Sequence, residues 1–134
     1  MRLKTALGWV KMTVKKSTPI WYIWKLGDQA DGQIQAHIQV PRQSPWFDGH
    51  FPDAPLLPGV AQLGMVLDIL CHVSERPLTV EQVSRVRFKQ MIRPEQPLLL
   101  TIKPIDAPDS HSFRIVGDAG LICSGLIRLK AVDA

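Results

Sequence analysis

The sequence predicts an α+β domain in which an antiparallel sheet packs against one long helix. Three observations support this class. The chain has 134 residues, the usual size of one domain, it carries one long apolar pattern of helical period, and strand-like segments lie on both sides of that pattern. A single helix cannot bury its apolar stripe alone, so the sheet must wrap around it or pack on its face. We therefore expect one domain over residues 1–134.

Two strands are expected ahead of the helix. Residues 20–24 have the aromatic and β-branched composition of a strand, and residues 33–40 alternate strictly between apolar and polar. The apolar face of the second strand carries Ile34, Ala36, Ile38 and Val40. Glycines at both ends of the segment 27–32 indicate a turn between the two strands.

The helical pattern starts at Pro58, which suits a first helical position because that position needs no N–H donor. Pro77 lies just beyond the expected end of the helix. Over about four turns the apolar stripe carries Val60, Leu63, Leu67, Leu70 and Val73.

Further strands are expected after the helix. They cover residues 83–90, 98–105, 112–117 and 121–132. Asp118, Ala119 and Gly120 lie between the last two and favour a hairpin turn. The expected order is therefore two strands, one helix and an antiparallel run.

Composition excludes several classes of protein. No apolar run reaches the roughly 20 residues of a membrane span, and the apolar stretch after the basic start Met1-Arg-Leu-Lys4 is too short for a signal peptide, so we expect a cytoplasmic protein. Cys71 and Cys123 lie far apart without metal-ligand spacing, which favours buried reduced thiols and no metal or other cofactor. The formal charge of +4 suits an acidic partner, but no nucleic-acid-binding motif is present.

One segment carries a specific resemblance. Residues 49–63 read GHFPDAPLLPGVAQL, which resembles the signature of the 3-hydroxyacyl-(acyl carrier protein) dehydratases. Residues 46–52, WFDGHFP, and residues 57–63, LPGVAQL, are most similar to the dehydratases found with aryl polyene synthesis genes. Residues 86–94 and 125–129 resemble later strands of the same family. The resemblance implies a hotdog fold, with the sheet wrapped around the central helix, and a role in fatty acid or polyene synthesis.

The motif suggests how such a protein would work. Dehydration of a 3-hydroxyacyl thioester needs a base at C2, an acid at the C3 hydroxyl and a donor to the thioester oxygen. His50 is the candidate base, since histidine is largely neutral at working pH. Gly59 would let the substrate approach the free N–H groups of the helix start, and the resemblance assigns the donor role to its amide. The expected acyl tunnel is lined by Phe51, Leu56, Leu57 and Leu63. The other histidines, His37, His72 and His111, are interpreted as surface or strand-face residues.

The sequence departs from the family where the acid is expected. That position holds Gly64, which suggests either a lost side chain or a close approach by backbone or ligand. Asp68, one turn later and about 6 Å along the axis, is a possible substitute acting through a water, or simply a solvated or interface carboxylate. Asp53 replaces a family glycine near His50, and Gln62 could orient substrate only if it faces inward.

A basic strand face offers a clue to the partner. Arg85, Arg87 and Lys89 alternate with apolar residues in the expected strand 83–90, and Arg93 extends the set. These side chains would either form a plain solvated face or dock an acidic acyl carrier protein or the phosphates of coenzyme A.

Three functions therefore compete. The first is a 3-hydroxyacyl-thioester dehydratase, the second a hotdog thioesterase using Asp53 or Asp68, and the third a non-catalytic acyl-binding or carrier-binding protein, such as the inactive half of a heteromeric pair. The resemblance also implies a homodimer or an assembly of dimers, because the family builds its active site across a two-fold interface.

Overall fold

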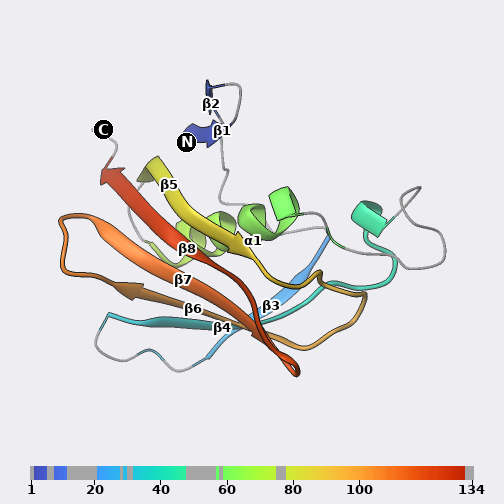
Figure 1. Ribbon diagram of the computed structural model, residues 1–134. Helices are drawn as coiled ribbons and strands as arrows, with labels where there is room; N and C mark the ends of the chain where they lie inside the picture. The colour runs from blue at the N-terminus through green and yellow to red at the C-terminus, as the bar shows by residue number, and fades with distance from the viewer. Residues whose placement is uncertain are drawn as a thin grey trace.

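The computed structural model describes residues 2–5, 8–11, 21–27, 29, 32–47, 57, 59–74 and 78–131. Its main body is a six-stranded antiparallel sheet with the order β3-β4-β6-β7-β8-β5. The strands are β3 (Ile23–Leu26), β4 (Ile34–Gln39), β5 (Leu78–Phe88), β6 (Leu98–Pro104), β7 (Ser110–Gly117) and β8 (Gly120–Ala131). Figure 1 shows the sheet curving around helix α1 (Gly59–Val73). This is the α+β arrangement that the sequence predicts.

Helix α1 follows the predicted pattern closely, and Pro58 itself lies outside the described residues. Leu63, Leu67 and Leu70 are buried, as expected for the apolar stripe. Val60 is different, because 54% of it is exposed. It lies on a strip of α1 that continues at four-residue steps through Gly64, Asp68 and His72, none of which is fully buried. The prediction that Val60 joins the core was therefore wrong.

The inner face of the sheet supplies the other half of the core. Alternate residues of each strand point towards α1, as the period of two requires. The fully buried ones include Ala36, Leu100, Ile102, Phe113, Ile115 and Cys123. This core holds α1 across the sheet and fixes which side of the helix stays uncovered.

The strand boundaries differ most from the predictions in β3 and β5, and by no more than two residues in the strands that follow. Strand β3 begins at Ile23, not at residue 20, because pairing with β4 starts at Ile23 opposite Gln39. Strand β5 starts five residues before the predicted 83–90 segment and ends at Phe88. Polar residues in the first half of β5 hide its apolar–polar alternation, so its start was missed. Beyond its end, the N–H groups of Lys89 and Gln90 both donate to the Ile122 carbonyl. The Asp118–Ala119 turn between β7 and β8 is confirmed.

Two small elements were not predicted. A two-stranded hairpin, β1 (Arg2–Thr5) with β2 (Gly8–Lys11), forms near the N-terminus and lies close to β5. A short 3-10 turn, η1 (Pro45–Phe47), leads towards the segment that carries the sequence motif. Within the described residues, no helix is long and apolar enough to cross a membrane.

Candidate active site

Leu57, the described residue nearest the start of α1, is held by a backbone hydrogen bond. The N–H of Leu57 donates to the carbonyl of Ile92 at 2.8 Å, and both side chains are fully buried. The residues just before it, 48–56, lie outside the described residues, and with them His50, Phe51, Asp53 and Leu56. Their predicted roles stay predictions. Leu57 and Leu63, the described members of the expected tunnel lining, are both buried in the core.

Gly59 opens the helix beneath an aromatic ring. A Cβ placed on Gly59 would lie 2.9 Å from Cζ of Phe88, so the ring packs directly on the glycine. This contact is one physical reason for glycine here. The first N–H groups of an α-helix have no partner inside the helix, so the amide of Gly59 belongs to a set that suits hydrogen bonding to a ligand oxygen.

The strip of α1 that faces away from the sheet contains an opening. Within the described part of the chain, a Cβ on Gly64 would meet no atom within 4 Å beyond its own helix neighbours. The described residues therefore leave the space beside Gly64 open, at the position where the acid is expected from the sequence. Asp68 lies one turn further along the same strip, about 6 Å along the axis.

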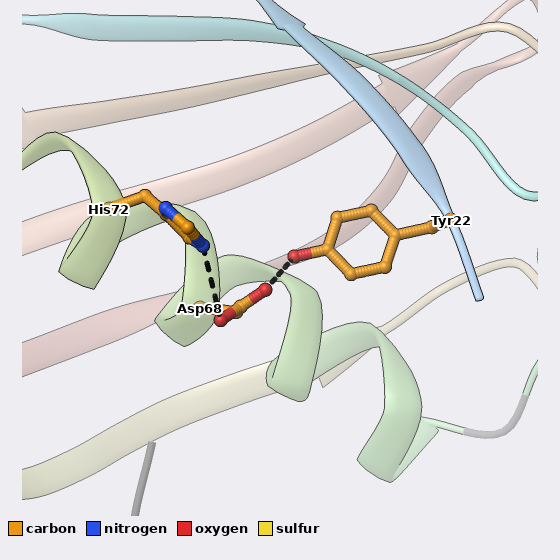
Figure 2. Close-up of polar contacts among 3 residues, drawn as sticks. All are labelled: Tyr22, Asp68 and His72. Atoms are coloured by element: carbon orange, nitrogen blue, oxygen red, sulfur yellow. Dashed lines mark hydrogen bonds and ion pairs between the residues drawn. The ribbon is translucent and has the colours of Figure 1, made fainter. Parts of the chain in front are cut away.

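Figure 2 shows that Asp68 is already engaged by two side chains. The hydroxyl of Tyr22, which lies just before β3, donates to Oδ2 of Asp68. Nε2 of His72 lies 4.0 Å from Oδ1 of the same carboxylate, one helical turn away. Both Asp68 and His72 keep 19% of their side-chain surface exposed. Asp68 is therefore a half-buried carboxylate held within this chain.

Aromatic rings pack on the two partners of this carboxylate. Only 3% of Tyr22 is exposed, and its ring meets that of Trp21 edge-on with centroids 4.6 Å apart. The ring of Trp24 lies 5.7 Å from that of His72. Burial, and secondly the Asp68 carboxylate, raise the pKa of Tyr22 far above its ordinary value of 10.0, so its hydroxyl keeps its proton and donates.

Tyr22 is the functional candidate that sequence reasoning missed. It is the chain's single tyrosine, which was a weak signal by itself. Its partner lies 46 residues away along the chain, on a different element, so no local pattern links them. The strand predicted over residues 20–24 also assigned Tyr22 to a ladder in which it does not take part.

Gln62 does face inward. It is fully buried, its Nε2 lies 3.5 Å from the carbonyl of Leu57, and its Oε1 has no hydrogen-bond partner among the described residues. From the sequence, Gln62 could orient substrate only if its side chain faces inward, and it does. Its unpaired amide oxygen can still accept a hydrogen bond.

The predicted basic set divides into two parts. Arg85 and Arg87 line a hollow of about 630 Å³ on the outer face of the sheet, together with Arg114 of β7, while small residues such as Ser124 and Gly125 also line it. Lys89 and Arg93 are exposed but do not line this hollow. A β-bulge between Ser84 and Arg87 changes the register, and Arg85 has a positive φ of 52° at this point. Simple alternation along the strand could not anticipate this.

The arginines of the hollow have no acidic partner within the part of the chain that the structure describes. Glu81 pairs with Arg128, and Asp68 lies 4.0 Å from Nε2 of His72, so neither of these carboxylates contacts an arginine of the hollow. Both cysteines are free thiols, Cys71 partly exposed and Cys123 buried, and burial raises the pKa of Cys123 to about 12. No cluster of three potential metal ligands occurs among the described residues.

Comparison with known proteins relates this geometry to a family. A model described as ApeI-like, ApeI dehydratase, matches residues 27–126. A 3-hydroxyacyl-[acyl-carrier-protein] dehydratase FabZ of Clostridium perfringens is 25% identical over 132 residues, covering 88% of this chain and 92% of the relative. The FabZ of Streptococcus suis is 30% identical over 103 residues, covering 69% of this chain and 74% of its own length.

Solved structures agree on the fold. The dehydratase heterocomplex ApeI:P from Xenorhabdus doucetiae matches with a TM-score of 0.69 and 27% identity, over 84% of this chain and 98% of the matched one. A hypothetical thioesterase with coenzyme A from Streptococcus pneumoniae matches with a TM-score of 0.63 over 82% and 86%, and at 10% identity it shows the fold alone. The hotdog fold is thereby confirmed. By its sequence from residue 27 to 126 and by its fold, this chain belongs to the ApeI-like dehydratase family.

Proposed function

We propose that this protein is a hydro-lyase that dehydrates 3-hydroxyacyl thioesters, with His50 as the base and the amide of Gly59 as the donor to the thioester oxygen. The observation that carries the proposal is the open space at Gly64, with a carboxylate, Asp68, one helical turn away on the same strip. That space lies where the family's acid is expected to act. A dehydratase framework with room for a water in place of the acid explains both features.

The reaction divides among three groups. The imidazole of His50 takes a proton from C2 of the substrate, and the electron pair left behind forms the C2–C3 double bond as the C3 hydroxyl departs. The hydroxyl leaves as water, so it must receive one proton. Negative charge builds on the thioester oxygen meanwhile, and the partial positive charge at the start of α1 stabilises it.

Asp68 reaches the leaving hydroxyl only indirectly in this proposal. Tyr22 donates to one of its oxygens and His72 lies near the other, so the carboxylate is held back from the space over Gly64. A water in that space would bridge the remaining distance: it gives a proton to the leaving hydroxyl and takes one from Asp68, which must be protonated for this step and regains its proton from solvent after each turnover. This arrangement is less direct than a carboxylic acid at the reacting atom, so we expect slow turnover.

A second copy or a related chain is expected to complete the site. Large apolar side chains are exposed near the start of α1 and at the end of β5, with Val60 at 54%, Phe88 at 46% and Met91 at 42%. Such exposed groups favour association. A homodimer would supply a facing helix. A heteromer is the second candidate, favoured by the ApeI:P heterocomplex of the relative, and in that case this chain could be the partner that lacks the acid.

The basic hollow on the outer face supports an acidic carrier. Arg85, Arg87 and Arg114 converge there without a carboxylate neighbour in the described part of the chain. Guanidinium groups bind phosphate and carboxylate strongly. We therefore expect the acyl group to arrive on acyl carrier protein or coenzyme A, and the protein to work in the cytoplasm.

The test is a dehydration and hydration assay with paired variants at the open position. Purified protein is given 3-hydroxyacyl and 2-enoyl thioesters of both carriers. His50→Ala should lower interconversion by roughly 100- to 10,000-fold. Gly64→Glu should raise it by about 100-fold or more, because the side chain enters open space and restores a general acid.

Gly64→Gln is the matched control, since it fills the same space without a proton to give. If both variants raise the rate equally, the gain reflects packing and the proposed acid role is wrong. Release of free thiol instead of interconversion would identify a thioesterase. Activity only after addition of a homologous dehydratase chain would favour the heteromeric candidate.

A further inference from the structure

A pocket lies at the opposite end of α1 from the sequence motif. It has a volume of about 310 Å³ and opens between the last turns of the helix and the inner face of the sheet. Its walls are mainly apolar, with Leu70 and Val73 from α1, Leu78 from β5 and Leu129 from β8. Ligand pockets typically start at about 300 Å³, so the space is sufficient for a small molecule. Leu70 is about 16 Å along the helix from Gly59, which separates this pocket from the motif.

One polar group in this pocket is unsatisfied. His111 belongs to β7 on the face that also carries Phe113 and Ile115, both fully buried, so its ring faces the helix layer. Its Nδ1 is buried and has no hydrogen-bond partner within the described residues. Buried polar atoms in folded proteins nearly always have a partner, so this nitrogen points to a missing one.

The charges around the pocket select the kind of ligand. The C-terminal end of a helix carries partial negative charge, and Asp109 adds a carboxylate to the lining. Among the lining residues that the structure describes there is neither lysine nor arginine. Burial lowers the pKa of His111, partly offset by Asp109, so the imidazole is neutral at physiological pH. An anion is therefore disfavoured, and the apolar walls disfavour a strongly hydrated cation.

We propose that this pocket binds a small neutral molecule with an apolar body and one hydroxyl group, which forms a hydrogen bond with Nδ1 of His111. An alcohol of this kind satisfies the unpaired nitrogen and fills the apolar volume at once. The site goes beyond the dehydratase proposal, because it uses neither His50 nor the start of α1.

Benzyl alcohol and ethylbenzene are suitable probes, because they match in size and differ in the hydroxyl group. Binding to the whole protein is followed by the NMR signals of the His111 ring and by titration calorimetry. Benzyl alcohol should bind about 2- to 10-fold more tightly than ethylbenzene, the range of one net hydrogen bond. Benzoate, which has a similar shape but a negative charge, should bind more weakly than both.

Two variants test the assignment from opposite walls. His111→Ala keeps the pocket open, so it should still bind ethylbenzene and lose the preference for the alcohol. Leu70→Phe fills the pocket from α1 and should abolish binding of both probes. Equal affinity of the wild-type protein for the two probes, tighter binding of benzoate, or no binding at all would each overturn the proposal.

Discussion

The two halves of α1 differ in how completely their outward strip is covered. In the first half, Val60 is exposed and the position of Gly64 faces open space. In the second half, Asp68 is held by Tyr22 and lies near His72, beside the ring of Trp24. Among the described residues, side chains of the chain itself thus cover the outward strip of the second half of α1 and leave that of the first half uncovered. The uncovered first half can contact substrate or a second chain, whereas the covered second half holds Asp68 in place.

Raising the pH should weaken the Tyr22–Asp68 contact in the second half of α1. We expect this to cause the largest loss of stability among the changes considered. The pKa of Tyr22 is raised in the folded state, so above about pH 10 the unfolded chain loses this proton first. The stabilisation is complete below that pH and falls as the pH rises, by up to about 1.4 kcal/mol per unit. Because the chain has one tyrosine, tyrosinate absorbance reports on this group alone.

Urea unfolding between about pH 8 and pH 11 measures the loss of stability directly. The variant Tyr22→Phe should show a flatter alkaline profile. Tyrosinate absorbance that appears near pH 10 while the protein stays folded would contradict the tight Tyr22–Asp68 contact.

Removing the tyrosine hydroxyl should destabilise the covered second half of α1 at neutral pH. In Tyr22→Phe, the Asp68 carboxylate loses its donor while it remains half-buried. Hydrogen bonds to charged groups contribute about 1.5–3 kcal/mol, so we expect a loss of about 2 kcal/mol in the free energy of unfolding. Asp68→Asn should lose less, because the amide oxygen still accepts from Tyr22. A double-mutant cycle with Asp68→Ala should give a coupling energy near 1 kcal/mol or more, and additive losses would refute the contact.

Two glycine substitutions contrast the start of the helix with its open middle. Gly64→Ala should stabilise the protein by up to about 1 kcal/mol, because alanine favours the helix and its methyl group meets no neighbour. Gly59→Ala should destabilise it by about 1 kcal/mol or more, since the new methyl group would press on the ring of Phe88 at 2.9 Å. Thermal unfolding of both variants compares them. Equal shifts of Tm would show that Phe88 moves aside freely.

The spacing of apolar residues and the residues typical of turns made most of the fold predictable. The helical stripe predicted α1 closely, and strict alternation predicted β4. The early start of β5 and the true start of β3 depend on partners in the sheet, and local composition does not contain that information. The N-terminal hairpin was missed because its short strands lack a clear alternating pattern.

The candidate site was predictable only in part for the same reason. Asp68 and Gly64 could be placed on one helical strip from spacing alone. The hold of Tyr22 on Asp68 and the addition of Arg114 to the basic hollow arise from contacts between distant segments. His111, interpreted as a surface or strand-face residue, does lie on a strand face, but on the inner one and beside a pocket.

The smallest expected effect concerns His111, at the far end of the covered second half. Burial lowers the pKa of His111 below its ordinary 6.5, and the Asp109 carboxylate only partly opposes this. As the pH falls through 6.5, the unfolded chain therefore binds this proton first and the folded state loses stability, until the pH reaches the lowered pKa. Above about pH 7 both states are neutral at this ring and the effect vanishes. Urea unfolding at about pH 7.5 and 5.5 should show a smaller acid-side loss in His111→Asn than in the wild-type protein. An alcohol bound to neutral Nδ1 should lower the pKa of His111 further, and NMR titration of the ring would detect this. If the pKa of His111 is unchanged or raised with benzyl alcohol present, Nδ1 does not bind the alcohol.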